Sequence, residues 1–390
     1  ESGKGEGDPT YNEALNLSVA YSHANLFGGE LTLRGFYYDF YALYGGGTFP
    51  AFQDPAIAPA GTLFDQSALS SEKYGTKLTF VRDNTFWDGL QVAAGVDYLR
   101  DKTYQELAQT DRLWVPEMIY KGWAPFVQLE QRLVDDRLRL SFGGRFENVE
   151  LEVPDFTTVA GANNTFVEGG EPSFEELLGN AGIVFDVTED LTVFASYAEG
   201  FTMPDAGLIL RGVNIPGQTI DELVDLQPVV ADNLETGINY RRGGLDIAAS
   251  YFWSDSDLGS RILVVDGVGQ ITRQKTEIEG LEVSAAYHFD SGVSTGIAYS
   301  QLEGRFDSDG DGSVDKDLDG RNIAPDRINL YVEAPLAANW HGRLQYSKLL
   351  DRDFDGGLPQ HDFDGYSVVD AVVSYRDASL GNFTLGIENL

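Results

Sequence analysis

Apolar and polar residues alternate along much of this 390-residue chain, and the stretch 182–205 shows the pattern most clearly. From Ile183 to Tyr197, apolar side chains recur at every second position on both sides of a short segment at 187–191. A period of two is typical of a strand with one apolar face. The stretch therefore predicts two strands joined by a tight turn, the second running into a long polar loop that begins at Thr202.

Sixteen segments follow this pattern, and they form eight pairs. The predicted strands are 14–22 and 30–41, 73–81 and 90–99, 121–132 and 137–150, 175–185 and 191–200, 233–240 and 245–252, 278–288 and 293–302, 327–333 and 341–347, and 366–375 and 382–388. The two strands of each pair flank a short turn with Gly, Asp, Asn or Pro, as hairpins do. Long polar loops are predicted between the pairs, near 45–72, 102–117, 154–173, 202–232, 254–276, 306–326 and 349–365.

The alternation of short and long connections predicts an antiparallel meander with one tight end and one elaborated end. Outer-membrane β-barrels have this form, with short periplasmic turns and long extracellular loops. We expect aromatic residues near the strand ends to form interfacial girdles: Tyr37, Tyr98, Trp123, Tyr197, Tyr251, Tyr287, Tyr299 and Tyr346. A soluble β-helix, propeller or chain of sandwiches is the alternative, but no fixed-length blade repeat is found.

Composition narrows the possible functions. The formal net charge of −35 disfavours a nucleic-acid partner, because binding phosphates requires basic contacts. The absence of cysteine excludes thiol catalysis, thiolate metal sites and disulfides within the chain. No apolar run is long enough for a transmembrane helix. The first eight residues are polar and unlike a signal peptide, so we expect the chain to be the interior of a longer protein.

Several motifs resemble those of TonB-dependent outer-membrane receptors. Tyr-Ala-Glu-Gly-Phe-Thr-Met-Pro-Asp at 197–205 is similar to a segment common in that family, and 234–240 and 277–283 resemble its next two strands. Residues 363–370 and 385–390 resemble strands close to the family's C-terminus. Within the family, 364–390 and 200–211 look most like receptors of the ferric aerobactin type.

The resemblance implies an all-β fold: an antiparallel transmembrane β-barrel of about 22 strands, filled by an N-terminal plug. Matching the final segment to the last strand but one places about 16 of the 22 strands in this chain. We therefore expect about five strands before residue 1 and one after Leu390. The plug, with the segment that contacts TonB, is expected to lie outside this chain.

The resemblance also implies a function: a monomeric receptor in the outer membrane of a Gram-negative bacterium, embedded in lipid, that imports a ferric siderophore of the hydroxamate or citrate-hydroxamate type. The TonB–ExbB–ExbD complex would supply energy through the plug, and neither a catalytic residue nor a required cofactor is expected. Alternatives are a receptor for haem, cobalamin or an oligosaccharide, a passive porin, a calcium-stabilised surface barrel, or a soluble calcium-binding β-protein. Of the four histidines, only His361 lies in a predicted long loop, which argues against haem.

Ligand-binding residues are expected in the long loops and the upper lumen. An anionic ferric siderophore needs cations against the acidic background, and the candidates are Arg211, Arg261, Arg273 and Lys275. Possible aromatic walls are Phe201, Tyr104, Trp114 and Trp253. The alternative for each cation is an ion pair with a carboxylate of a neighbouring strand.

A second candidate site is the acidic segment 307–319, which begins like an EF-hand loop. Its possible Ca²⁺ ligands are Asp307, Asp309, Asp311, Asp315, Asp317 and Asp319. Leu318 stands where an EF-hand has its bidentate Glu, and no flanking helices are expected. The alternative is a solvated acidic loop. The string at 292–296 matches a nucleophile elbow, but it lies at a hairpin turn rather than between a strand and a helix, so no enzyme is predicted.

Overall fold

The computed structural model describes residues 10–265, 268–355 and 362–390, and in them the chain is almost entirely β-structure. The sixteen long strands are β1 (Tyr11–Leu26), β2 (Gly29–Leu43), β3 (Ser67–Arg82), β4 (Leu90–Leu107), β5 (Arg112–Leu133), β6 (Leu138–Glu152), β9 (Ser173–Asp186), β10 (Leu191–Thr202), β11 (Val229–Arg242), β12 (Leu245–Val265), β13 (Val268–His288), β14 (Ser294–Phe306), β16 (Arg327–Ala337), β17 (Trp340–Leu349), β18 (Tyr366–Asp377) and β19 (Gly381–Ile387). They confirm the sixteen predicted strands and their pairing into hairpins.

The remaining elements are short and belong to the connections. They are β7 (Phe156–Thr157), β8 (Phe166–Val167), β15 (Lys316–Asp317), the helix α1 (Ala206–Arg211), and the 3₁₀ turns η1 (Pro50–Phe52), η2 (Ala160–Ala162), η3 (Ile220–Glu222) and η4 (Val224–Leu226). Among the helices of the described residues, none has the length and apolarity needed to cross a membrane.

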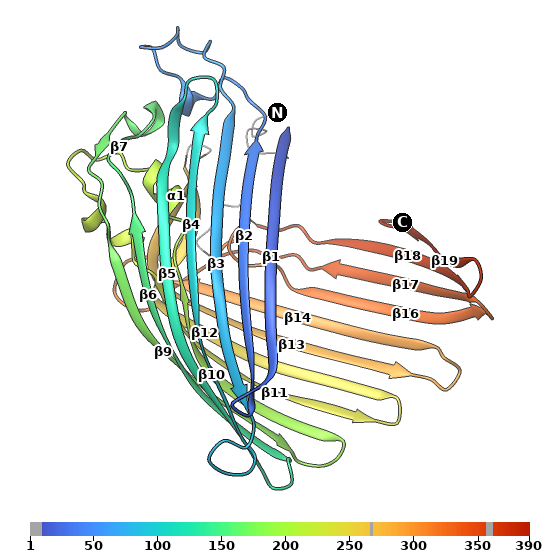
Figure 1. Ribbon diagram of the computed structural model, residues 1–390. Helices are drawn as coiled ribbons and strands as arrows, with labels where there is room; N and C mark the ends of the chain where they lie inside the picture. The colour runs from blue at the N-terminus through green and yellow to red at the C-terminus, as the bar shows by residue number, and fades with distance from the viewer. Residues whose placement is uncertain (1–9, 266–267, 356–361) are drawn as a thin grey trace.

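Each long strand pairs antiparallel with the next long strand along the chain, so the sheet is a continuous meander. The sheet curls strongly, with β1 and β19 at its two ends (Figure 1). The short hairpin turns follow one edge of the curled sheet, and the longer connections lie along the other (Figure 1). This arrangement is the partial antiparallel barrel that the sequence predicts.

The register separates an outward apolar face from an inward face. Val193 of β10 lies opposite Phe185 of β9 and Ile238 of β11, so apolar side chains form continuous rows across neighbouring strands. Ile183 and Ile238 in these rows are exposed. Exposed apolar rows of this kind are what a lipid-facing barrel surface requires.

Five inward-facing aromatic residues each stand directly opposite a glycine on the adjacent strand. The pairs are Phe36 with Gly75, Phe126 with Gly95, Phe194 with Gly237, Phe252 with Gly280, and Tyr331 with Gly296. A Cβ added to any of these glycines would lie within 2.4–2.7 Å of the partner ring. The rings therefore occupy the space that a side chain would take, which explains why glycine is present in the middle of these strands.

Two predicted loops are mostly strand. In the predicted loop 102–117, β4 continues to Leu107 and β5 begins at Arg112, so the connection is a short turn. In the predicted loop 254–276, β12 continues to Val265 and β13 begins at Val268. The predicted loop at 45–72 ends earlier, because β3 begins at Ser67. Polar residues can pair as strands above the lipid, where their side chains are solvated and their backbone groups still need partners. Polarity was therefore a poor indicator of where these strands end.

The connections at 153–172, 203–228 and 307–326 remain long, as predicted. The connection after β17 includes residues 356–361, and these, with His361, lie outside the described residues. The 203–228 connection carries α1, which contacts both β5 and β13. Because these two strands lie far apart in the sheet order, α1 lies across the concave side of the sheet and covers part of the barrel mouth.

The 203–228 connection, which we call the inner loop, contributes to the largest apolar core of the structure. The buried members of this core are Leu151, Val153, Phe156, Val167, Ile209, Leu210, Val213, Ile220 and Leu226, with Ile271 of β13 packed against them. The inner loop is thus held by packing against the ends of β5, β6 and β13.

Candidate ligand site on the concave side of the barrel

A cavity of about 490 Å³ lies where the end of β10 meets the wall formed by β2 to β6. We call it the upper-lumen cavity. Its lining includes Phe36, Lys77, Asp97, Tyr120, Arg145 and Phe201. Aromatic residues and several charged side chains therefore line one space, a combination typical of small-molecule sites. Phe201 is the one predicted ligand residue that lines it.

The charges of this cavity are arranged around Asp97. Its Oδ2 atom lies 2.9 Å from Nη1 of Arg145 and 4.0 Å from Nζ of Lys77. Arg145 also contacts the carboxylate of Glu147, so its charge is shared between two acids. Lys77 has a longer contact and a side chain that is 60% exposed. Lys77 is therefore the cation of this cavity that can most readily accept an additional anionic partner.

The structure brings two of the predicted residues together, Arg211 and Trp114. The guanidinium carbon of Arg211 lies 4.2 Å from the centre of the Trp114 ring, and both side chains are buried. Asp205 caps α1 by accepting a hydrogen bond from the Leu208 amide at 3.0 Å, and Arg211 is the last residue of that helix. A buried cation–π contact of this kind fastens α1 to β5. Arg211 thus helps to hold the inner loop in place, and it does not line the upper-lumen cavity.

The other three predicted cations lie on the extended β12–β13 hairpin, apart from Phe201. Arg261 stacks over Phe306 at 3.9 Å. Arg273 donates hydrogen bonds to the carbonyl oxygens of Asp225 at 3.1 Å, Pro228 at 3.3 Å and Leu258 at 2.7 Å. These contacts join the hairpin to the inner loop.

Lys275 lies 3.7 Å from Asp255 and 3.9 Å from Glu277. These distances correspond to the alternative that the sequence left open, an ion pair with carboxylates of its own and the neighbouring strand. Its charge is therefore already balanced by two acids in this arrangement.

The register places Tyr104 and Trp253 on the outward side of the sheet. Trp253 lies opposite Leu234 and shares a strand face with the exposed Tyr251. Tyr104 has the same parity on β4 as the exposed Tyr98. Neither residue lines the upper-lumen cavity.

Sequence reasoning missed Phe36, Lys77, Tyr120 and Arg145. The sequence did contain a signal for the inward orientation of Lys77 and Arg145. A Lys or Arg that alternates with apolar residues in a membrane strand has to face the lumen, because lipid does not solvate it. Lys77 lies between Thr76 and Leu78, both outward by register. Which of the inward charges share a cavity depends on the curl of the sheet, which the sequence did not supply.

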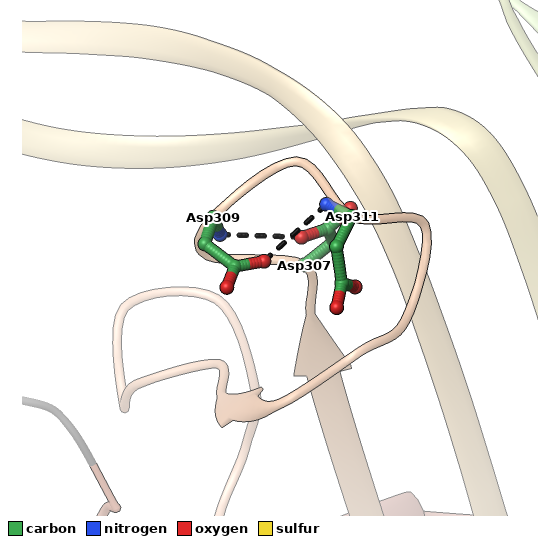
Figure 2. Close-up of side chains that lie close together, drawn as sticks. All are labelled: Asp307, Asp309 and Asp311. Carbon is green, nitrogen blue, oxygen red and sulfur yellow. Dashed lines mark hydrogen bonds between the residues drawn. The ribbon is translucent and has the colours of Figure 1, made fainter.

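The acidic segment 307–319 gathers three of the six predicted ligands. One carboxylate oxygen from each of Asp307, Asp309 and Asp311 lies within 4.8 Å of the others, and Figure 2 shows the three side chains on one turn. Asp307 accepts backbone hydrogen bonds from Gly312 at 2.8 Å and Gly310 at 2.7 Å. These hydrogen bonds hold the pKa of the Asp307 carboxyl below its usual range, and the bond from Gly312 has the largest effect.

The other three predicted ligands have separate partners. Asp315 accepts bonds from the amide and hydroxyl of Ser308, both at 2.8 Å, which lower the pKa of its carboxyl. Asp317 accepts from the Asp355 amide at 2.9 Å, and Asp319 from the Arg321 amide at 3.1 Å. Leu318 is 3% exposed and packs with Phe306 and Ile323. Leu318, which stands where an EF-hand has its bidentate glutamate, thus belongs to an apolar core. Calcium binding by this segment stays a prediction.

The family model for the β-barrel of TonB-dependent receptor-like proteins matches residues 2–390. The chain therefore belongs to this family, whose members are outer-membrane transport receptors of Gram-negative bacteria and not enzymes.

Its curated relatives include the ferric aerobactin receptor of Klebsiella pneumoniae, which is 24% identical over 96% of this chain and 54% of the relative. The rhizobactin receptor of Rhizobium meliloti strain 1021 is 22% identical over 72% of this chain and 41% of the relative. The chain thus spans about half the length of the ferric aerobactin receptor.

Solved structures share the fold. The copper transporter OprC has a TM-score of 0.78 at 15% identity, covering 98% of this chain and 61% of that protein. The ferric yersiniabactin uptake receptor FyuA of Yersinia pestis has a TM-score of 0.71 at 14% identity, covering 97% of this chain and 56% of that protein.

Proposed function

We propose that this chain is the barrel portion of an outer-membrane receptor that imports a ferric siderophore, of the hydroxamate or citrate-hydroxamate type. The observation that carries the proposal is the similarity to ferric aerobactin receptors along 96% of the chain. The rhizobactin receptor, a second relative named for a siderophore, supports the same class of ligand.

The upper-lumen cavity is the proposed ligand contact of this portion. Phe36 and Tyr120 offer ring surfaces to the apolar arms of a siderophore, and Phe201 lines the same cavity from the end of β10. Lys77 offers an ammonium group to a ligand carboxylate, because Asp97 is 4.0 Å away and does not enclose it. The inner loop covers the neighbouring part of the mouth and limits the access of water to the bound complex.

We also propose partners for the whole receptor. Release of a tightly held ligand toward the periplasm needs an energy source, and the TonB–ExbB–ExbD complex, acting through a plug domain, is the proposed one. The receptor is proposed to work as a monomer surrounded by outer-membrane lipid.

Equilibrium binding to the purified full-length receptor tests the ligand and the cavity together. The probes are a ferric citrate-hydroxamate siderophore, which carries free carboxylates, and a neutral ferric trihydroxamate. Lys77→Ala is expected to weaken binding of the first about tenfold, as the loss of about 1.4 kcal/mol from a charged hydrogen bond requires. Binding of the neutral complex should be unchanged.

Lys348→Ala is the matched control, because Lys348 lies opposite Ile328 on the outward face of β17, next to the last residue of the strand at its loop end. It removes the same charge without touching the cavity. Equal losses for Lys77→Ala and Lys348→Ala would contradict the role of the cavity. Failure of the unaltered receptor to bind any ferric siderophore would contradict the proposed function itself.

A further inference from the structure

A second cavity, of about 970 Å³, is lined by residues of β10 to β17 on the concave side of the sheet. We call it the turn-side cavity, because its lining includes Glu189 and Asp190 of the β9–β10 turn. It extends from there to Arg327, the first residue of β16, and so reaches the loop end of that strand. It shares no lining residue with the upper-lumen cavity, and its volume is within the range of small-molecule sites.

Arg327 faces this cavity and is held by a chain of hydrogen bonds. It is exposed and has the same parity on β16 as the inward-facing Tyr331. Its Nε atom donates to Oδ1 of Asn329 at 3.0 Å, and the same oxygen accepts from Oγ of Ser347 at 2.8 Å. Nε2 of Gln345 donates to that Ser347 oxygen at 3.3 Å. The guanidinium is thus fixed through Nε, while its two Nη atoms have no hydrogen-bond partner among the described residues.

The acids nearest to Arg327 in the sheet have other partners. Asp326, its neighbour in the chain, accepts a hydrogen bond at 2.9 Å from a tyrosine hydroxyl on the outward face. Glu333 lies 3.5 Å from Nη1 of Arg343, and Asp370 accepts a backbone hydrogen bond at 3.0 Å from the last residue but one. In the part of the chain that the structure describes, no carboxylate lies within 4.0 Å of Arg327. Its charge is therefore not balanced by an ion pair.

The acids that line the turn-side cavity lie at its opposite end. Asp246, the second residue of β12, contacts Arg241, and Asp190 lies 3.7 Å from Nε of Arg242. Glu189 is exposed in the β9–β10 turn. The cavity is therefore polarised: the guanidinium at its loop end attracts an anion, and the carboxylates at its turn end repel one.

We propose that Arg327 binds a carboxylate of the anionic ligand while the ligand passes through the lumen, after it leaves the upper-lumen cavity. A guanidinium binds a carboxylate through two parallel hydrogen bonds, and one that is already fixed through Nε loses little freedom on binding. The acids at the turn end disfavour retention of the same carboxylate, as passage requires. This inference rests on the proposed function, which supplies the ligand. A carboxylate of the plug is the alternative partner, and it would make Arg327 necessary for every ligand.

Separate measurements of binding and uptake in cells that express the full-length receptor test this role. The probes are a ferric citrate-hydroxamate siderophore with free carboxylates and the same siderophore with those carboxylates converted to amides, both carrying radioactive iron. They are supplied at saturating concentration, and uptake is expressed per receptor that binds ligand. Arg327→Gln is expected to lower the uptake rate of the carboxylate form about tenfold, with its equilibrium binding unchanged. Uptake of the amide form should be unchanged.

Lys348→Gln is the matched control, because Lys348 lies opposite Ile328 on the outward face of the same strand pair. It should leave the uptake of both forms unchanged. Asn329→Asp is a second test that keeps the arginine. Its new carboxylate would replace the amide oxygen 3.0 Å from Nε of Arg327 and balance the charge, so it should slow uptake of the carboxylate form alone.

Uptake of the carboxylate form at the unaltered rate in Arg327→Gln, or in Asn329→Asp where Arg327→Gln does not insert, would overturn the proposal. An equal loss for the carboxylate and amide forms would also overturn it, because Arg327 would then serve the plug rather than the ligand. Failure of the unaltered receptor to bind either form would contradict the proposed function instead.

Discussion

A buried carboxylate holds the connection between β2 and β3 to the turn between β4 and β5. Asp65 has no exposed surface, and it accepts hydrogen bonds from Nη2 of Arg112 at 2.7 Å, Oγ1 of Thr110 at 2.9 Å and the amide of Gln109 at 3.2 Å. The same Arg112 nitrogen also donates to the carbonyl oxygen of Phe52 at 3.0 Å. The 44–66 connection should therefore open as a unit when this network is broken.

Asp65→Asn keeps the shape of the side chain but removes the charge that faces Arg112. A hydrogen bond to a charged group contributes about 1.5–3 kcal/mol, so we expect the opening free energy of the connection to fall by about 2 kcal/mol. That loss corresponds to an opening constant about 30 times larger. Asp65→Ala should cost more, about 3–5 kcal/mol, because it leaves the guanidinium uncompensated in a mostly buried position.

Hydrogen exchange followed by mass spectrometry measures this opening. The amides of Gly47 and Asp65 each donate to the other residue's carbonyl oxygen at 3.1 Å, so both should exchange about 30 times faster in Asp65→Asn, while the middle of β3 is unchanged. Asp111→Asn is the control, since Asp111 is exposed and its φ of 52° suits asparagine. Unchanged exchange at Gly47 and Asp65 would show that the Asp65–Arg112 contact does not hold this connection closed.

Three further predictions concern the strands and the acidic loop. Gly237→Ala should lower the free energy of unfolding by about 1–3 kcal/mol in urea titrations of the vesicle-bound receptor, because the new Cβ would lie 2.5 Å from the carbonyl oxygen of Ala249. Gly144→Ala is the control: its new Cβ would have its nearest neighbour at 3.9 Å, so it should change the free energy of unfolding little. The lowered pKa of Asp307 means that its ionised form stabilises the loop above the ordinary carboxyl range, and that this stabilisation is lost as pH falls through the lowered pKa. Pepsin should therefore cut the loop of the unaltered receptor only at the acid end of a pH series, and the loop of Asp307→Asn throughout. If the loop binds calcium, terbium luminescence should appear in the unaltered receptor and disappear in Asp311→Asn; an absence of luminescence in the unaltered receptor would remove the calcium prediction.

The strands could be predicted because one physical constraint acts on every second residue. Lipid on the outward face admits few polar side chains, so the period of two is visible along 191–200 and in the fifteen other predicted strands. The constraint ends where the lipid ends. The extensions of β12 to Val265 and of β5 back to Arg112 lie beyond the predicted strand ends, and their pairing depends on neighbouring backbones rather than on an alternating sequence pattern.

The candidate site was less predictable for a related reason. The inner loop was correctly predicted to be long, but its α1 helix and the burial of Arg211 against Trp114 depend on residues brought together from distant strands. Lys77 and Arg145 could be predicted to face inward, whereas their meeting around Asp97 requires the curl of the sheet. An isolated arginine in a polar loop is compatible with a ligand contact and with a structural contact, and the side chains around it are known only from the fold.

Uptake of radioactive iron by cells that express the full-length receptor tests the central proposal most directly. We expect saturable uptake of a ferric citrate-hydroxamate siderophore that disappears when TonB is deleted and is reduced in Lys77→Ala but not in Lys348→Ala. Uptake that persists at the same rate without TonB, or no uptake of any ferric siderophore by a correctly inserted receptor, would contradict it.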